Sequence, residues 1–316
     1  MITLALVGDV MLGRGVNDAL RTLRPDQPWG DVLPLLISAD LRIVNLECAI
    51  TDHKQPWTRT PKVFHFRAEP SAVEVLKAAR VDVCSLANNH TLDFEERGLL
   101  DTMEHLKTAG IRYAGAGRDR EESARSALLT ARPADQPSRV ALLAFTDNEL
   151  PFAAGSDRPG TNYLPVSLEP DVLGRVEAAV MAAREAEADT VVFSNHWGPN
   201  MVQRPSALFR RFARAVLDRG VEIYGGKLIL YDTGDFIDDY VVHPKLRNDR
   251  SFLFRIFLEG SEFRRLELVP VTLPYARAQL AEGSEREAIL DRMEHLSGEM
   301  GTAFVRREGR LVLEHS

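Results

Sequence analysis

Four apolar runs of the sequence end in side chains that could bind a metal ion. The runs and their side chains are residues 4–7 with Asp9, 41–46 with Glu47, 81–86 with Asn88, Asn89 and His90, and 190–194 with His196. Carboxylates, an amide oxygen and an imidazole together suit divalent cations of the hard or borderline type. Two carboxylates at close range also need a cation between them, or one of them must hold a proton. The sequence therefore predicts a divalent-metal site.

Each of these side chains has an ordinary structural interpretation when it is taken alone. Asp9 could cap a helix, and His90 could be a hydrogen-bonded core histidine. Glu47 is harder to explain in this way, because it lies between Leu46 and Cys48 and a carboxylate in an apolar setting needs a partner. The coincidence at four run ends favours a shared site over four separate structural roles.

The apolar runs have the length and composition of buried strands. Residues 140–145 add another such run, and helical patterns lie at residues 94–109, 172–186 and 205–219. Strands that alternate with helices predict an α/β fold with helices packed on sheet faces. Because ligands bind at the carboxyl ends of strands in such sheets, the candidate side chains are expected at one edge.

The C-terminal part of the chain shows a different pattern. Residues 227–232, 251–258 and 264–272 look like consecutive strands, and residues 284–296 look like a helix. We expect a single domain over residues 1–316, in which antiparallel strands from about residue 251 complete a second sheet.

Composition narrows the class of protein. A chain of 316 residues that is 45% hydrophobic can bury a core without disulfides. A net charge of −7 gives no general attraction to nucleic acid or to anionic membranes. The chain shows no run of about 18 apolar residues that would span a membrane and no signal peptide, so we expect a cytoplasmic protein. The sequence is silent on oligomeric state.

Several segments resemble the CapA proteins of poly-γ-glutamate capsule biosynthesis. They are GDVMLGR (8–14), NLECAIT (45–51), FHFRAEP (64–70), SLANNHTLDF (85–94), GAGRD (115–119), NHWG (195–198) and KLILYDTGDFI (227–237). The similarity runs from the N-terminus to about residue 260. Since that family is similar to calcineurin-like phosphoesterases, the resemblance implies a four-layer αββα sandwich of the metallo-dependent phosphatase type with mixed sheets. It also implies two divalent metal ions, of Mn, Fe, Zn or Mg.

The resemblance implies roles for individual residues. The implied metal ligands are Asp9, Glu47, Asn89 and His196, with Glu47 as the bridging carboxylate. His90 is the implied general acid that protonates the leaving oxygen, helped by a pKa close to the working pH. The candidates for binding an anionic substrate are Arg14, Asn88, Arg67 and His65.

The chain also departs from the family pattern. Met11 stands where the wider superfamily has a ligand histidine, and the strand and Gly-His-x-x-His segment expected after Gly220 are absent. If this segment is truly deleted from the protein, we expect weak or no binding of the second metal ion. The acidic run of Asp232, Asp235 and Asp238 either contributes to the metal site or forms a solvated turn.

The favoured hypothesis is a metal-dependent hydrolase that acts on a phosphate ester, in a small molecule or a polymeric anion. One alternative is a non-catalytic binding or assembly protein of poly-γ-glutamate capsule synthesis, which the missing histidines favour. Another is a metallohydrolase that cleaves γ-glutamyl amide bonds with the same metals.

Overall fold

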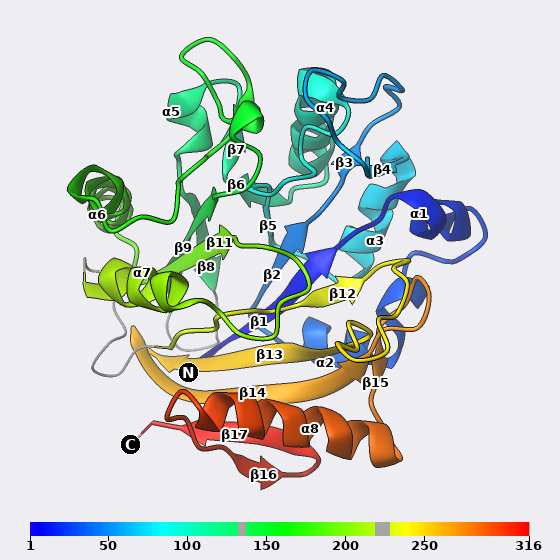
Figure 1. Ribbon diagram of the computed structural model, residues 1–316, viewed down its shortest axis with the longest axis vertical. Coiled ribbons are helices and arrows are strands. Elements are labelled where there is room, and N and C mark those ends of the chain that lie inside the picture. Colours follow the sequence, from blue (N-terminus) through cyan, green and yellow to red (C-terminus); the bar gives the residue numbers. More distant parts are fainter. Residues whose placement is uncertain (132–136, 219–227, 316) are drawn as a thin grey trace.

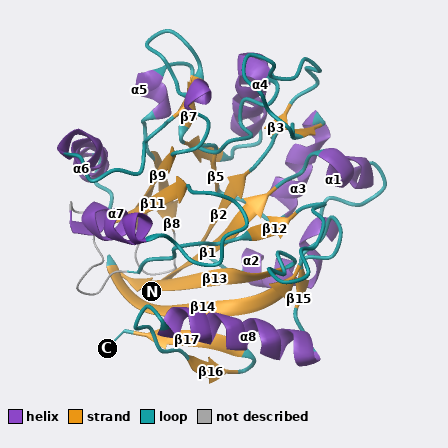
Figure 2. Ribbon diagram, viewed as in Figure 1, coloured by secondary structure: helices purple, strands orange, loops and turns teal. Residues whose placement is uncertain are grey.

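The chain folds around one large mixed β-sheet, seen in the computed structural model (Figures 1 and 2), which describes residues 1–131, 137–218 and 228–315. Its main path follows the order β16-β17-β14-β13-β1-β2-β5-β6. These strands are β1 (Ile2–Val10), β2 (Leu41–Leu46), β5 (Val83–Ser85), β6 (Arg112–Ala114), β13 (Arg250–Glu259), β14 (Glu262–Thr272), β16 (Val305–Arg307) and β17 (Arg310–Glu314). Strands β1, β2, β5 and β6 are parallel, and the C-terminal strands join them antiparallel through β13.

Shorter strands complete this part of the fold. The strand β12 (Asp235–Ile237) pairs with β1, and β15 (Gln279–Leu280) pairs with β14. Two small pairs are formed by β3 (Ala49–Ile50) with β4 (Arg67–Ala68) and by β7 (Ala116–Gly117) with β10 (Gly160–Thr161).

A second sheet of three strands packs on the large one. It contains β8 (Ala127–Ala131), β9 (Ser138–Thr146) and β11 (Thr190–His196) in the order β11-β9-β8. Leu4, Ile43 and Val83 of the large sheet share a buried cluster with Val140 and Leu142 of β9. Such aliphatic side chains supply the apolar area that holds two sheets face to face.

Helices cover the outer faces of both sheets, as Figure 1 shows, except α8, which packs on the face of the large sheet that the smaller sheet also covers. The helices are α1 (Arg14–Leu20), α2 (Leu33–Ile37), α3 (Val73–Ala78), α4 (Glu95–Thr108), α5 (Arg120–Ser123), α6 (Pro170–Glu185), α7 (Ala207–Asp218) and α8 (Gly283–Gly298), with short 3-10 turns at Gln27–Val32, Pro70–Ala72 and Leu150–Phe152. Apolar residues of α1 to α4 form one core with the large sheet, and α6 and α7 form another with β9 and β11. The predicted α/β fold with mixed sheets in four αββα layers is confirmed.

Two predictions about the C-terminal part were wrong. The strands after residue 250 do not complete the smaller sheet, because β13 pairs with β1 and extends the large sheet, and α8 packs on that extension. The strand expected at residues 227–232 is also not formed at 228–232, and Lys227 lies outside the described residues. Strand pairing with β1 begins only at Asp235, where the backbone reaches the edge of the site.

No helix in the described ranges has both the length and the apolar composition needed to cross a membrane.

Gly8 in β1 allows the closest backbone approach near the site. A Cβ built on Gly8 would lie 1.6 Å from the carbonyl oxygen of Gly234, a backbone atom that cannot move aside alone. We expect Gly8→Ala to lower the free energy of unfolding by about 3 kcal/mol, as for other severe steric substitutions. Gly174→Ala is the matched control: it lies inside α6 with open space around its Cβ, and should raise stability by about 0.5–1 kcal/mol. Chemical denaturation measures both, and equal effects would refute the steric argument.

Candidate metal centre

The candidate ligands come together where four parallel strands end. In the register of the large sheet, Asp9 of β1 lies between Asp235 of β12 and Asn45 of β2, and Asn45 pairs in turn with Ser85 of β5. Side chains at paired positions of neighbouring strands lie on the same face of a sheet. The fold thus lines up a row of polar side chains at the carboxyl edge.

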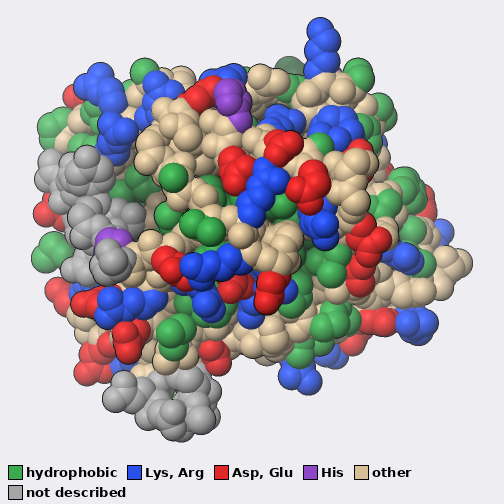
Figure 3. Space-filling model, turned by 90° about the horizontal axis from the view of Figure 1, so that it is seen from below, with side chains coloured by type: hydrophobic (Ala, Val, Ile, Leu, Met, Phe, Trp, Pro, Cys, Tyr) green, Lys and Arg blue, Asp and Glu red, His purple; other side chains and the backbone are tan. Residues whose placement is uncertain are grey.

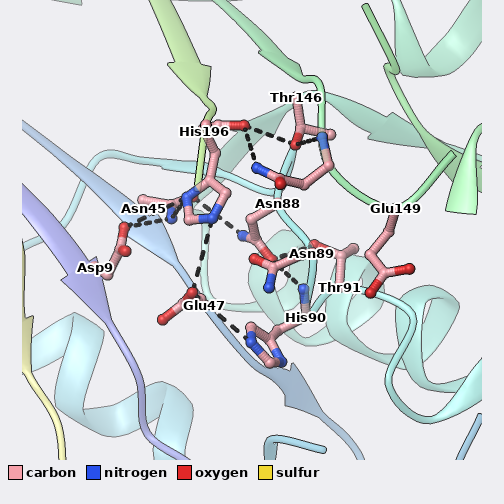
Figure 4. A network of polar contacts seen from close by, with 12 residues as sticks. Asp9, Asn45, Glu47, Asn88, Asn89, His90, Thr91, Thr146, Glu149 and His196 are labelled. Carbon is pink, nitrogen blue, oxygen red and sulfur yellow. Dashed lines mark hydrogen bonds and ion pairs between the residues drawn. The ribbon is translucent and has the colours of Figure 1, made fainter. Parts of the chain in front are cut away.

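The smaller sheet adds His196 to this row from the end of β11. One ligand atom each of Asp9, Glu47 and His196 lies within 4.8 Å of the others. Figure 4 shows the three side chains converging from different strands. His196 is held in place by its own backbone carbonyl, which accepts hydrogen bonds from Thr146 at 2.8 Å and Asn148 at 3.3 Å.

Asn45 connects two of these candidate ligands. Its amide nitrogen donates to a carboxylate oxygen of Asp9 at 2.7 Å and lies 3.2 Å from Nδ1 of His196. Its amide oxygen accepts from Asn88 at 3.1 Å. Asn45 therefore fixes the orientation of an implied ligand on each sheet, as groups around metal ligands commonly do.

The carboxylates of the site repel one another. Burial raises the pKa of Glu47 well above its ordinary value, and the charges of Asp9 and Asp235 raise it further. Burial likewise raises the pKa of Asp235 well above its ordinary value, with Asp9 adding to the effect. These two carboxylates are thus costly to ionise as the protein stands, and a cation among them would remove that cost.

His196 carries the opposite tendency. Burial lowers its pKa, but the nearby carboxylates of Asp9, Asp147 and Asp232 outweigh burial, so the pKa is raised above the ordinary value. The acidic surroundings therefore favour a positive charge at this position, whether a proton or a cation supplies it.

The residues present fit a divalent cation. The donor set of two carboxylates and an imidazole is one that Mn, Fe and Zn accept. In addition, the amide oxygen of Asn89 is buried without a hydrogen-bond partner, and Figure 4 places Asn89 beside the three ligands. Over the described residues, Asp9, Glu47 and His196 form the one group of three such ligands.

Met11, which stands where the wider superfamily has a ligand histidine, packs in the hydrophobic core. Its side chain is fully buried in the core beside the large sheet, and its sulfur accepts a hydrogen bond from the backbone of Gly13 at 3.1 Å. The position after Gly220, where the resemblance implies two more histidines, lies outside the described residues.

His90 forms a buried pair with Asp93, which the sequence analysis did not single out. Nδ1 of His90 lies 2.6 Å from Asp93, and Nε2 lies 3.9 Å from Glu47. The ring is stacked on Phe66 with centroids 3.7 Å apart. His90 thus presents one nitrogen toward the candidate ligands while Asp93 and Phe66 hold the ring.

The prediction that the pKa of His90 lies close to the working pH was wrong. Burial lowers the pKa of His90 to about 2, with the positive charge of Lys62 acting in the same direction. Burial raises the pKa of Asp93 to about 7, against the opposing charge of Lys62. Near neutral pH the pair can therefore hold one shared proton, and the carboxyl of Asp93 is the group that titrates there.

The ammonium of Lys62 contacts both this pair and the Asn89–His90 turn. Its side chain is 5% exposed, and its ammonium donates to the backbone carbonyl of Asn89 at 2.7 Å. The same nitrogen lies 3.4 Å from Asp93 and 3.3 Å from Glu149. One buried cation therefore connects the loop of residues 52–66, the Asn89–His90 turn and the loop after β9.

We expect Lys62→Met to weaken Mn²⁺ binding by about 10- to 100-fold, the usual cost of losing a group that orients a metal site. The buried Asp93 and the partly exposed Glu149 would lose their cation, and the Asn89–His90 turn would lose a hydrogen bond to its backbone. Lys54→Met is the control, since Lys54 is an exposed lysine of the same loop. Calorimetric titration of Mn²⁺ into the two variants tests this, and equal affinities would show that Lys62 has no positioning role.

The residues predicted to bind an anion fall into two groups. Asn88 is fully buried and donates to the Leu46 carbonyl at 2.9 Å, so it fixes the turn of residues 88–90 against the end of β2. Arg14 lies 3.4 Å from Asp239, with its guanidinium near the rings of Phe64 and Phe66 and its side chain 38% exposed. Arg14 is thus the candidate that is open to solvent near the stacked ring of His90.

Arg67 and His65 have other contacts. The guanidinium of Arg67 donates to the Thr51 carbonyl at 2.8 Å, and Nε2 of His65 donates to the Trp57 carbonyl at 2.9 Å. The His65 contact thus lies within the loop of residues 52–66, and the Arg67 contact joins the two residues that flank this loop. The structure does not bring either of them to Asp9, Glu47 and His196.

The layered α/β sandwich and the carboxylate–histidine group at its strand ends define the class: an α/β protein with a candidate metal centre between two sheets. Residues 3–240 match the model of the family described as bacterial capsule synthesis protein PGA_cap. The chain belongs to this family.

Curated relatives agree with this assignment. A probable polyglutamine synthesis accessory protein of Mycobacterium tuberculosis is 31% identical over 366 aligned residues, covering 99% of this chain and 95% of the relative. The capsule biosynthesis protein CapA of Bacillus anthracis is 28% identical over 86% of this chain and 67% of its own length. The PGA biosynthesis protein CapA of Bacillus subtilis is 25% identical over 100% of this chain and 83% of its own length. The recognition of the CapA family from sequence motifs is confirmed.

The alignment with the Mycobacterium tuberculosis relative has 366 positions, more than the 316 residues of this chain. The relative therefore contains residues that this chain lacks.

Distant likenesses to solved structures also exist. A calcineurin-like phosphoesterase from Bacillus subtilis is 10% identical, with a TM-score of 0.40 over 94% of this chain and 97% of that structure. The NAD nucleotidase of Haemophilus influenzae is 10% identical, with a TM-score of 0.43 over 93% of this chain. The chain spans 62% of the length of that nucleotidase.

Proposed function

We propose that the protein is a divalent-metal-dependent hydrolase of the CapA family that acts on a phosphate ester. The observation that carries the proposal is the meeting of Asp9, Glu47 and His196 within 4.8 Å, with His90 directed at the same place from the other side of Glu47. A metal centre with a proton donor at its border is the arrangement that metal-assisted hydrolysis requires.

Asp9, Glu47 and His196 would hold the ion, with Asn89 as a further oxygen donor and Asn45 as the residue that orients Asp9 and His196. When bound, a divalent ion supplies an acidified water and polarises a substrate oxygen. Two ions remain our expectation. Asp235 beside Asp9 gives a carboxylate for the second ion, and this is the role we assign to Asp235 within the acidic run.

The proton for the leaving oxygen comes from the His90–Asp93 pair. Near neutral pH the Asp93 carboxyl can hold a proton and donate a hydrogen bond to Nδ1 of His90, so that the neutral ring carries its own hydrogen on Nε2. Transfer of that hydrogen to the leaving oxygen is balanced by movement of the Asp93 proton to Nδ1. Asp93 is a positioning residue and a proton store in this scheme, and His90 is the catalytic residue.

The substrate is an anion in this proposal. Arg14 is positively charged, open to solvent and close to Phe66, on which His90 stacks. It is the side chain placed to bind an anionic group that extends from the centre. The names of the curated relatives support a polymer or its precursor as the source of that anion.

The assay for this proposal is hydrolysis of an aryl phosphodiester with Mn²⁺, compared between the wild type and His90→Ala. The proposal expects wild-type turnover that EDTA removes, and a rate that the variant lowers by about tenfold or less for this activated aryl leaving group. A γ-glutamyl anilide in the same assay tests amide cleavage. Metal binding without turnover of either compound would replace the hydrolase with the binding-protein alternative, which the absent histidine segment favours.

A further inference from the structure

A second concave site lies away from the candidate metal centre and is lined mainly by basic side chains. We name it the basic pocket. Its lining residues are Gln203, Arg204, Lys245, Arg247, Arg250, Arg292, His295 and Leu296. The cavity has a volume of about 340 Å³, which is within the range of small-molecule sites. Three separate parts of the chain build it: the segment before α7, the segment leading into β13, and the C-terminal half of α8.

The charge of the basic pocket contrasts with that of the whole protein. Five of its lining residues are Lys or Arg, while the chain as a whole has a net charge of −7. Figure 3 shows the molecule from below, where Lys and Arg side chains lie among Asp and Glu side chains. A local excess of one charge in a concave site concentrates ions of the opposite sign.

Carboxylates hold three of the five cations in fixed orientations. Glu285 pairs with Arg250 at 2.8 Å and with Arg247 at 3.2 Å, and Asp249 accepts two hydrogen bonds from Arg247 at 2.8 Å. In the same way, Glu299 accepts two hydrogen bonds from Arg204 at 2.6 and 2.7 Å. These three carboxylates balance three cations and leave two charges in excess.

Lys245 and Arg292 supply that excess. Within the described ranges, neither side chain forms an ion pair within 4 Å. The guanidinium of Arg292 donates a hydrogen bond to the carbonyl of Leu246. Lys245 lies in the segment before β13 and Arg292 lies on α8. A ligand that contacts both side chains must therefore carry two charged groups, or one group with several oxygen acceptors. The ammonium of Lys245 and the remaining N–H groups of Arg292 can donate to an oxyanion, the group that guanidinium and ammonium recognise.

We propose that the basic pocket binds an oxyanion that carries at least two carboxylate or phosphate groups. This binding is independent of the proposed hydrolase activity.

The test is fluorescence anisotropy of a labelled hexa-L-glutamate peptide with the EDTA-treated protein at 0.15 M salt, with tripolyphosphate as a competitor. The double variant Lys245→Ala/Arg292→Ala should raise the Kd at least tenfold. Arg97→Ala/Lys107→Ala is the control, because it removes the same charge from exposed positions on α4 and should change the Kd less than twofold. Melting temperatures establish that all three proteins are folded, and Lys245→Glu alone serves if the double variant is not.

Each outcome decides the proposal. Pocket-dependent binding of the peptide supports the carboxylate source, and pocket-dependent binding of tripolyphosphate alone supports the phosphate source. Equal weakening in the pocket and control variants, or no binding of either probe, overturns it. Because the protein is EDTA-treated, probe binding is measured separately from metal-dependent hydrolysis, so the pocket and the proposed function can fail independently.

Discussion

Glu47→Gln will remove Mn²⁺-dependent hydrolysis and at the same time raise the melting temperature of the metal-free protein. The activity should fall by roughly a thousandfold or more, because a bound divalent ion supplies several kcal/mol of transition-state stabilisation. Glutamine keeps the shape of the side chain and can still accept the hydrogen bond from Tyr240, which is 3.0 Å in the wild type.

The rise in stability follows from the sign of the pKa shift. Burial and the charges of Asp9 and Asp235 raise the pKa of Glu47 in the folded state. A carboxyl whose pKa is higher in the folded than in the unfolded state favours folding only while it is protonated. That contribution is lost as the pH rises above the unfolded pKa of about 4.3. At pH 8, the metal-free wild type therefore bears a cost that the glutamine variant lacks.

Differential scanning fluorimetry at pH 8, with EDTA and then with Mn²⁺, measures both parts of this prediction. The wild type should gain stability on adding Mn²⁺, and Glu47→Gln should not. Glu104→Gln is the control, since Glu104 is exposed on α4. A metal-free Glu47→Gln protein that melts below the wild type would contradict the account of charge crowding in the site.

His90→Ala will lower kcat most for substrates with poor leaving groups. General acid catalysis typically contributes about 10²- to 10⁴-fold, and the full loss is expected for alkyl phosphates, whose leaving oxygen needs a proton. For 4-nitrophenyl esters, whose leaving group is stable as an anion, the loss should be about tenfold or less by the same principle. Asp93→Asn should show the same dependence with a smaller loss, because Asp93 acts through His90.

Rates for a series of esters with leaving groups of increasing pKa test this prediction. A structural role for His90 would lower all rates by the same factor. In that case, the slopes of log kcat against leaving-group pKa would coincide for the wild type and both variants, and the proton-transfer role would be rejected.

The strand ends of the site could be predicted because local signals and topology agree there. Short aliphatic runs followed by Asp9, Glu47 and His196 gave both the strands and the candidate ligands, and parallel pairing placed them together. The C-terminal sheet assignment failed for a physical reason. Sequence patterning shows that β13 and β14 are strands, but it does not show which edge they join, and that edge is set by pairing with β1 over a long sequence separation.

The supporting residues of the site were harder to predict. Asn45 and Asp93 stand within the quoted NLE and NNHTLD segments, and their spacing of two residues from Glu47 and three residues from His90 was an available signal. The sequence offered no such signal for Lys62. This lysine lies in an irregular loop, and its role depends on contacts with the turn of residues 88–90 and the loop after β9. Arg67 and His65 were candidates because they lie in the FHFRAEP segment of the family resemblance, and their contacts with backbone carbonyls could not be predicted from sequence.

The most direct test of the metal centre is a titration of Mn²⁺ into the EDTA-treated wild type, followed by electron paramagnetic resonance of the free ion. The account predicts that the signal of free Mn²⁺ stays suppressed until one to two equivalents have been added. A free-ion signal that rises linearly from the first addition, as in buffer alone, would show that Asp9, Glu47 and His196 do not form a metal centre.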